Sequence, residues 1–233
     1  MIKGLIFDYG ATIDSNGKHW AEVIWEQYVA AKVPVTKQQF RAAYVYAERA
    51  LAVNPYIKPE DNFRRLMLVK IKLEFDYLLN EAILGPDDAW IETINAIAEG
   101  CYQEAKHTVA EAIKTLKILS ERYPMVLVSN FYGNIQAVLA DFGVDSFFPS
   151  IIESAIVGVR KPDPAIFMLG VKALNLKPSE VTVIGDSYRK DIQPALSLGC
   201  ETIWIKGIGW DESEDKIDHP AIITDFSELC NLL

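Results

Sequence analysis

The chain has 233 residues, of which 50% are hydrophobic and 24% are charged. This balance is typical of a globular protein and excludes a disordered or membrane-embedded chain. The formal net charge of −9 offers no general positive field to a polyanion, so we expect no nucleic-acid partner.

The first expected element is an apolar run over residues 2–7 that ends in Asp8. Its continuous apolarity predicts a strand covered on both faces. The run is too short for a signal peptide or a spanning helix, so we expect a cytoplasmic protein with no membrane partner. Three widely spaced cysteines, Cys101, Cys200 and Cys230, favour buried free thiols over a disulfide framework.

Residues 18–105 contain four amphipathic helical segments and no convincing strand. Thr36 with Gln39 forms a capping box at the start of the second segment. Helices of this kind pack as a small bundle. Because the insertion follows the first strand, we predict a cap domain over residues 17–105 above a core of residues 1–16 and 106–233.

The rest of the chain alternates short apolar runs with helical stretches. Strands are expected at 125–128, 181–184, 202–205 and 221–223, and helices at 108–122, 133–142, 163–174 and 188–198. This alternation predicts an α/β fold with a doubly wound parallel sheet.

Polar residues stand where three of the expected strands end, namely Asp8, Ser129 and Asp186. Ligands bind at the carboxyl ends of strands in open parallel sheets. Two carboxylates about 4 Å apart repel by roughly 4 kcal/mol at an effective dielectric of about 20. If they converge they need a cation or a proton between them, and magnesium suits oxygen ligands of this kind.

Four motifs in chain order resemble those of the haloacid dehalogenase superfamily. The segment that begins at Asp8 resembles the first motif, usually written DxDGT, and Ser129-Asn130 resembles the second. Lys161-Pro162 is similar to the third motif, and Gly185-Asp186 with Asp191 to the fourth. The family's helical cap after the first motif also matches the predicted insertion.

The resemblance implies a magnesium-dependent phosphatase that hydrolyses small phosphorylated metabolites through an aspartyl-phosphate intermediate. It implies that Asp8 is the nucleophile and that Ser129, Asn130 and Lys161 bind the phosphoryl group, with Lys161 also neutralising charge. It further implies that Asp8, Asp186 and the Gly10 carbonyl bind magnesium. Asp191 then supports the metal site or orients Lys161.

Gly10 departs from the family, whose usual second aspartate stands at this position as the general acid and base. General acid–base catalysis contributes about 10²- to 10⁴-fold, so we expect slow turnover unless another group substitutes. Asp14 and His19 are the candidates by proximity in sequence. A weakly basic leaving group, as in an acyl phosphate, needs no acid.

The same departure leaves three alternatives open. A dehalogenase needs no acid, but it also lacks the metal carboxylates that this chain keeps. A phosphonoacetaldehyde hydrolase-like enzyme uses a cap lysine as a Schiff base, and the candidates here are Lys18, Lys32, Lys58, Lys70 and Lys72. The third alternative is a catalytically silent fold that binds a ligand or a protein.

The sequence names no substrate and leaves the oligomeric state open. The candidates for a substrate pocket in the cap are Trp20, Trp25, Tyr28, Tyr44 and Arg64, although aromatic residues at helical spacing also build cores. The acidic stretch at 211–215 is expected to be a solvated loop.

Overall fold

The computed structural model describes residues 1–210, 213–214 and 216–233. In this part of the chain a six-stranded sheet has the order β3-β2-β1-β4-β5-β6, and every neighbouring pair is parallel. The strands are β1 Gly4–Phe7, β2 Met125–Ser129, β3 Ser150–Glu153, β4 Val181–Gly185, β5 Glu201–Ile205 and β6 Ile222–Ile223. The predicted doubly wound α/β fold is confirmed.

Five of these strands were expected, and β3 was not. It has four residues, of which only the last is buried, and it pairs with β2 alone at the edge of the sheet. A short, half-exposed edge strand lacks the continuous apolar run by which the central strands are recognised. Residues 211, 212 and 215 of the expected acidic loop lie outside the described residues.

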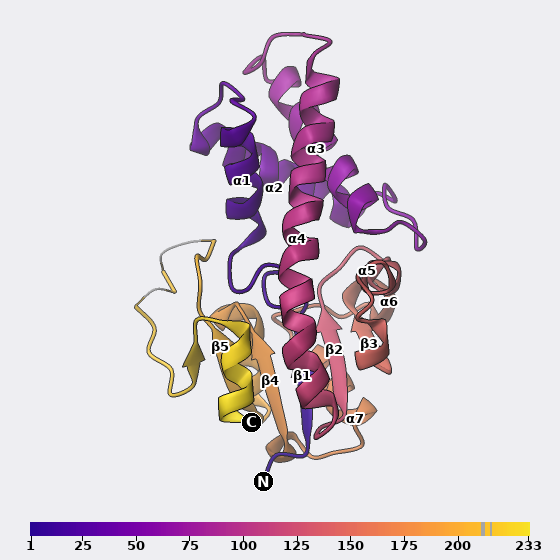
Figure 1. The fold of residues 1–233 in the computed structure, drawn as a ribbon, viewed down its shortest axis with the longest axis vertical. Coiled ribbons are helices and arrows are strands. Elements are labelled where there is room, and N and C mark those ends of the chain that lie inside the picture. The colour runs from indigo at the N-terminus through magenta and orange to yellow at the C-terminus, as the bar shows by residue number, and fades with distance from the viewer. Residues whose placement is uncertain (211–212, 215) are drawn as a thin grey trace.

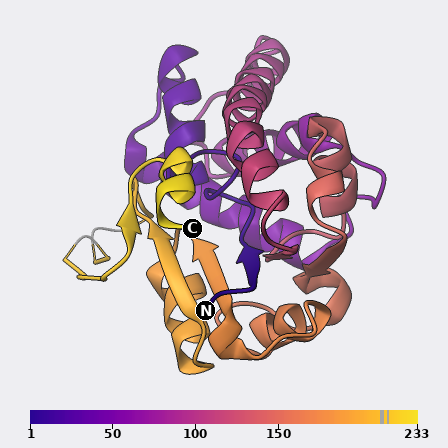
Figure 2. The same ribbon diagram turned by 60° about the horizontal axis from the view of Figure 1, so that its bottom comes forward.

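Helices cover both faces of the sheet, as Figures 1 and 2 show. One face, which includes Ile6 and Val128, packs against α7 (Ala165–Ala173). The other face, which includes Leu5 and Phe7, packs against α4 (Trp90–Ser120) and α5 (Ile135–Phe142). The alternation along β1 follows from the two-residue period of a strand. The core helices are α5 Ile135–Phe142, α6 Ser154–Val157, α7 Ala165–Ala173, α8 Gln193–Ser197 and α9 Leu229–Leu232.

Four helices precede β2, and the first three form the upper part of Figure 1 with the N-terminal half of the fourth. Their bounds are α1 Trp20–Ala30, α2 Lys37–Val53, α3 Phe63–Asn80 and α4 Trp90–Ser120. The Thr36–Gln39 capping box is present at the start of α2. Tyr28 of α1 is fully buried, and its ring lies 4.9 Å from Phe40 and 5.5 Å from Phe75. Phe75 also lies 5.7 Å from the ring of Trp90 in α4, so these contacts join all four helices as a helical cap.

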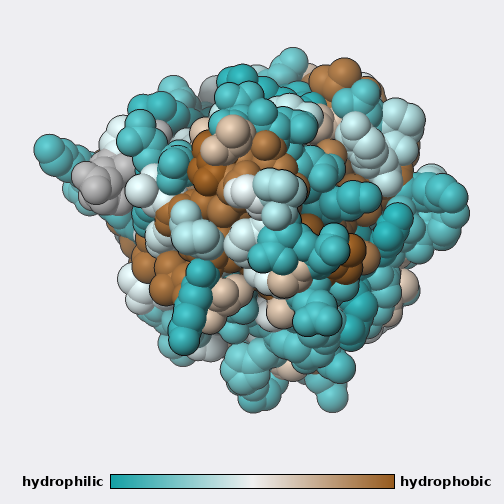
Figure 3. All heavy atoms as spheres, turned by 90° about the horizontal axis from the view of Figure 1, so that it is seen from above, coloured by the Kyte–Doolittle hydropathy of each residue, from teal (hydrophilic) through white to brown (hydrophobic). Residues whose placement is uncertain are grey.

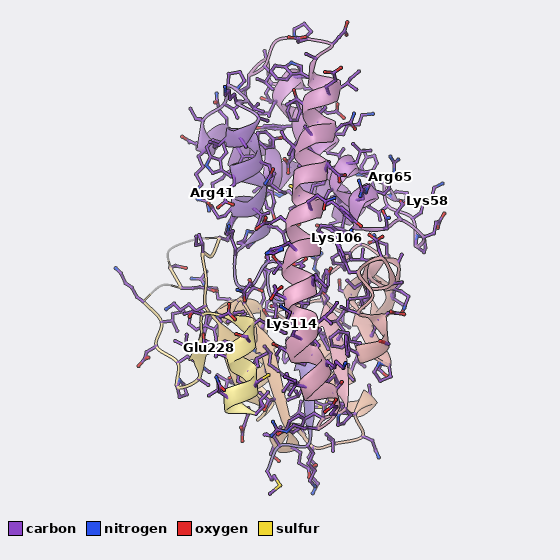
Figure 4. All side chains as sticks on the ribbon, viewed as in Figure 1. Arg41, Lys58, Arg65, Lys106, Lys114 and Glu228 are labelled. Atoms are coloured by element: carbon purple, nitrogen blue, oxygen red, sulfur yellow. The ribbon has the colours of Figure 1, made fainter. Side chains whose placement is uncertain are left out.

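Helix α4 is continuous over 31 residues, where the sequence suggested two separate segments. At 1.5 Å per residue it is about 46 Å long. It packs against α1 and α3 in the cap and against α9 in the core. Lys106 and Lys114 mark its solvent side in Figure 4. The predicted boundary after residue 105 falls inside this helix.

The surface of the cap mixes hydrophobic and charged residues. Figure 3 looks onto the molecule from above and shows brown hydrophobic residues interrupted by teal hydrophilic ones. Val29, Val53 and Ile91 are among the exposed hydrophobic side chains of the cap. Among the described residues, no helix combines the length and the apolarity that crossing a bilayer requires.

Candidate active site

The ends of β1, β2 and β4 bring the predicted residues together. Asp8 follows β1, and its backbone N–H donates to the Ile184 carbonyl of β4 at 2.9 Å. Ser129 is the last residue of β2, and Asp186 follows β4 directly. The sheet order reverses around β1, so these residues lie at the topological switch point where α/β folds bind ligands.

Lys161 joins this group from the loop between α6 and α7. Its Nζ lies 2.6 Å from Asp8 Oδ1 and 2.7 Å from Asp191 Oδ1, and its side chain is only 2% exposed. Burial lowers the pKa of Lys161, but the charges of Asp191 and Asp8 outweigh it, so the pKa is raised. The ammonium group is therefore protonated and shared between the two carboxylates.

Asn130 fixes the backbone of Lys161. Its Nδ2 donates to the Lys161 carbonyl at 3.1 Å, and its Oδ1 accepts from the Lys161 N–H at 2.9 Å. Both functions of the amide are thereby engaged. The side chain thus positions Lys161, and its predicted contact with the phosphoryl group stays a prediction.

A turn of π-helix, Tyr188–Ile192, places Asp191 beside Asp186. Asp191 Oδ2 accepts from the Ser187 N–H at 3.1 Å. A Cβ at Gly185 would lie 2.5 Å from the Asp191 Cβ, so this close approach requires glycine. Asp191 is thus held by the backbone on one side and by Lys161 on the other, which favours its predicted role in orienting Lys161.

Glu214 belongs to the stretch that was expected to be a solvated loop, and its contribution to the site was not predicted. Its carboxylate accepts from the Tyr188 N–H at 3.0 Å and from the Arg189 N–H at 3.1 Å. It therefore satisfies backbone donors at the start of the turn that carries Asp191. No local pattern indicated this, because Glu214 is 25 and 26 residues away from these two donors.

The donor set of the site fits a hard divalent cation. One carboxylate oxygen from each of Asp8, Asp186 and Asp191 lies within 4.8 Å of the other two. Burial raises the pKa of Asp186, and the charges of Asp191 and Asp8 raise it further. One lysine does not balance three carboxylates, and magnesium prefers oxygen ligands of this type. Gly10 lines the same cavity.

Gly10 leaves open space where the family has its second aspartate. A Cβ built on Gly10 meets no atom within 4 Å. The next residue, Ala11, has a φ of 64°, in the left-handed region that glycine favours. The turn after β1 is therefore intact without a side chain at position 10, and it has room for one.

The Asp14 carboxylate stabilises this turn through hydrogen bonds. Its Oδ1 accepts from the Ala11 N–H at 2.7 Å, and its Oδ2 accepts from Trp20 Nε1 at 2.9 Å. Burial raises the pKa of Asp14 to about 7. Asp14 therefore has a pKa suited to acid–base catalysis near neutral pH, but both of its oxygens already accept hydrogen bonds from the protein.

His19, the other candidate, caps helix α1. Its Nδ1 accepts from the Ala21 N–H at 3.1 Å. Burial lowers the pKa of His19 to about 3, so the ring is neutral at neutral pH. A neutral imidazole with Nδ1 occupied carries its proton on Nε2. His19 is therefore a hydrogen-bond donor toward the cavity that it lines.

The site opens into a cavity of about 740 Å³ between the core and the cap. Of the five residues proposed for a cap pocket, Trp20 and Tyr44 line it. Tyr28 is core, Trp25 packs on Phe40, and Arg64 pairs with Glu99 at the surface. Tyr28 and Trp25 pack within the helix bundle and Arg64 lies at the surface, so none of these three lines the cavity.

A charged cluster at the cap end of the cavity was also missed. Glu48 of α2 pairs with Lys70 of α3 and accepts from Tyr132 Oη at 2.8 Å. A local signal existed, since Lys70 and Glu74 stand four residues apart at buried positions of α3. Charged residues on an apolar helical stripe are rare unless they are paired.

A doubly wound sheet, a helical cap and a lysine–carboxylate cluster at the switch point together define a capped α/β enzyme. The family model of haloacid dehalogenase-like hydrolases matches residues 2–199. The chain belongs to this family and is a hydrolase, which confirms the resemblance in the motifs.

Curated relatives and a solved structure agree with this assignment. The chain is 31% identical to glyceraldehyde 3-phosphate phosphatase of Pyrococcus furiosus over 168 residues, and the aligned part covers 68% of each protein. It is 25% identical to phosphoglycolate phosphatase of Pectobacterium atrosepticum, over all of this chain and 92% of that protein. A solved structure of a haloacid dehalogenase-like hydrolase from Bacillus subtilis, bound to magnesium, shares the fold with a TM-score of 0.60 and 19% identity. The match covers 100% of this chain and 98% of that chain.

Proposed function

We propose that this chain is a magnesium-dependent phosphatase of small phosphorylated metabolites, with Asp8 as the nucleophile. The observation that carries the proposal is the Lys161 ammonium group 2.6 Å from Asp8 Oδ1, next to a carboxylate cluster that fits a divalent cation. A phosphoryl dianion is repelled by a bare aspartate. Here a buried cation already faces the attacking oxygen, and catalysis of phosphoryl transfer is largely positioning and charge stabilisation.

In the proposed reaction Asp8 attacks phosphorus, the bond from phosphorus to the leaving oxygen breaks, and an aspartyl phosphate forms. Water then attacks that phosphorus, which releases inorganic phosphate and frees Asp8. Ser129 binds a phosphoryl oxygen, and Lys161 neutralises charge on the phosphoryl group. Asp8, Asp186 and the Gly10 carbonyl would hold the magnesium, while Asp191 and Asn130 position Lys161. When bound, magnesium neutralises charge on the phosphoryl oxygens.

The glycine at position 10 shapes which esters react. With no aspartate there, the leaving oxygen departs without a dedicated proton donor. Weakly basic leaving groups, as in acyl and aryl phosphates, therefore react fastest, and alkyl esters react about 10²- to 10⁴-fold more slowly than with such a donor. The relatives named above suggest glyceraldehyde 3-phosphate and phosphoglycolate as physiological candidates.

Two alternatives are disfavoured by particular residues. A Schiff base needs a neutral lysine, and among the described candidate lysines Lys70 alone lines the cavity. Burial opposes the charge of Lys70, but Glu48 outweighs it and raises the pKa, so the amine is protonated. A dehalogenase has no use for Asp186 and Asp191 beside the nucleophile.

The test is phosphate release from acetyl phosphate and p-nitrophenyl phosphate with magnesium. We expect Asp8→Asn to lower the rate by at least about 10³-fold, because the nucleophilic oxygen is lost. Asp88→Asn, at an exposed cap position, is the matched control and should retain full activity. Equal turnover by Asp8→Asn and the unmodified protein would refute the assignment.

A further inference from the structure

The cavity holds a second charged group that the phosphoryl chemistry does not use. It consists of Glu48 on α2, Lys70 on α3 and Tyr132 on the loop after β2. Lys70 Nζ also lies 4.3 Å from the centroid of the Tyr44 ring. All four side chains line the same cavity as Asp8 and Lys161.

Within this cluster Glu48 is the member that a ligand can reach. The side chain of Lys70 is 4% exposed and that of Glu48 is 36% exposed. Lys70 therefore lies behind Glu48, where its ammonium group and the Tyr132 hydroxyl hold the carboxylate in place. A restrained carboxylate with free lone pairs is an acceptor for hydrogen-bond donors.

The protonation states of the cluster support this geometry. Burial raises the pKa of Glu48, but Lys70 and the hydrogen bond from Tyr132 outweigh burial and lower it. Glu74, the next carboxyl group along α3, accepts from Tyr28 Oη at 3.0 Å, and burial raises its pKa to about 8. Glu74 is thus protonated at neutral pH, and Glu48 is the ionised acidic partner of Lys70.

The same loop connects the two ends of the cavity. Ser129 ends β2 at the phosphoryl site, and Tyr132 follows three residues later to reach Glu48. One short segment of the chain therefore carries both a residue of the phosphoryl site and a residue that contacts Glu48. Because Asp8, Lys161 and Glu48 line one cavity, a phosphate ester bound at Asp8 would place its leaving group in the space that Glu48 also lines.

We infer that Glu48 binds hydroxyl groups of the leaving alcohol, so that the enzyme prefers phosphate monoesters of polyhydroxy alcohols over esters that carry a carboxylate there. The inference rests on the proposed function, because it assumes that the phosphoryl group binds at Asp8. Like charges repel a carboxylate from Glu48, whereas hydroxyls donate to it. His19, with its proton on Nε2, adds a donor to the same cavity.

Non-hydrolysable phosphonates test the inference independently of turnover. 3,4-Dihydroxybutylphosphonate replaces a glycerol ester, and 3-phosphonopropionate replaces an ester with a carboxylate. Calorimetry with magnesium should give tighter binding of the dihydroxy compound to the unmodified protein. Glu48→Gln should weaken this binding about 10- to 100-fold, the range of one hydrogen bond to a charged group. Binding of 3-phosphonopropionate should be unchanged or tighter.

Two further variants serve as controls. Tyr132→Phe removes one donor to Glu48 and should shift the preference in the same direction by a smaller factor. Glu92→Gln, at an exposed position of α4, should bind both compounds as the unmodified protein does. Equal losses for both phosphonates in Glu48→Gln, tighter binding of 3-phosphonopropionate by the unmodified protein, or no binding of either compound would overturn the inference.

Turnover of acetyl phosphate separates this result from the proposed function. Acetyl phosphate has neither hydroxyl nor carboxylate, so its hydrolysis reports on Asp8 alone. Hydrolysis without the binding preference refutes the role of Glu48. The binding preference without hydrolysis refutes the phosphatase proposal and leaves the role of Glu48 standing.

Discussion

At the scale of single residues, Gly10 is the position that limits the proposed chemistry. The space beside it is open, since a Cβ there meets no atom within 4 Å. An introduced carboxyl group therefore needs no rearrangement of the turn. It would stand at the position where related enzymes keep the group that protonates the leaving oxygen.

Gly10→Asp is expected to raise turnover of alkyl phosphates by about 10²-fold or more, because it supplies a general acid. Acetyl phosphate, whose leaving group needs no proton, should respond by less than about tenfold. The measurement is kcat for both substrates in magnesium. Gly10→Asn, which has similar size and no acid, is the matched control. An equal response of both substrates contradicts the explanation.

The site residues differ in how far the sequence could predict them. Asp8, Ser129, Lys161, Asp186 and Asp191 were predicted because they follow strands or stand in ordered motifs, and the structure brings them together. Their individual catalytic roles stay predictions. Glu48 and Glu214 were missed because their partners are distant in sequence, and only the tertiary fold brings those partners into reach.

At the scale of elements, α3 carries a buried carboxyl group, Glu74, whose pKa differs between the folded and the unfolded chain. Glu74 is completely buried, and its pKa of about 8 lies above the ordinary value of 4.5. The folded protein therefore binds a proton that the unfolded chain releases between these two values. Folding stability due to Glu74 is fully present below about pH 4.5 and declines as the pH rises toward 8.

Glu74→Gln should remove this pH dependence, because the amide does not titrate. We expect the free energy of unfolding of the unmodified protein to fall, relative to that of the variant, as the pH rises from 5 to 8 (about the window between the two pKa values). Chemical denaturation at several pH values measures the difference. A constant difference across this range shows that Glu74 does not titrate between the two states.

The elements themselves were predictable where they are long or apolar. The central strands and the cap helices were expected, since their patterns extend over several residues. Strand β3 was not, because it is short and lies at an edge. The π-helical turn at Tyr188–Ile192 was expected only as part of a helix, since its geometry depends on Glu214 and on contact with the strand end.

At the scale of the whole molecule, a loop of the core holds the cap. Trp210 lies in the loop that follows β5, and the guanidinium of Arg41 lies 4.3 Å from the centroid of its ring. Arg41 also donates to the Trp210 carbonyl, and the Tyr44 ring lies 5.4 Å away. Arg41 is labelled in Figure 4 near the level where cap and core meet. These contacts join the two sides of the cavity.

Trp210→Ala should loosen this contact and raise KM by about 3- to 10-fold, the range of one cation–π interaction. The expected effect on kcat is smaller, because the Trp210 ring contacts Arg41, Tyr44 and His19 rather than the reacting groups. Steady-state kinetics with p-nitrophenyl phosphate measures both constants. Trp210→Phe, which keeps an aromatic face, should restore most of the loss, and an unchanged KM in the alanine variant contradicts the role.

Helix α4 has a consequence for how the cavity admits its ligands. Its first half is packed into the cap and its second half onto the core, so both parts share one backbone without a loop between them. Rotation of the cap relative to the core must therefore bend this helix or slide one of its packed faces. The stiffness of the helix, rather than the length of a linker, then limits how far the cap can rotate. We expect the cap to move by a small bend along α4 rather than by swinging on a flexible linker.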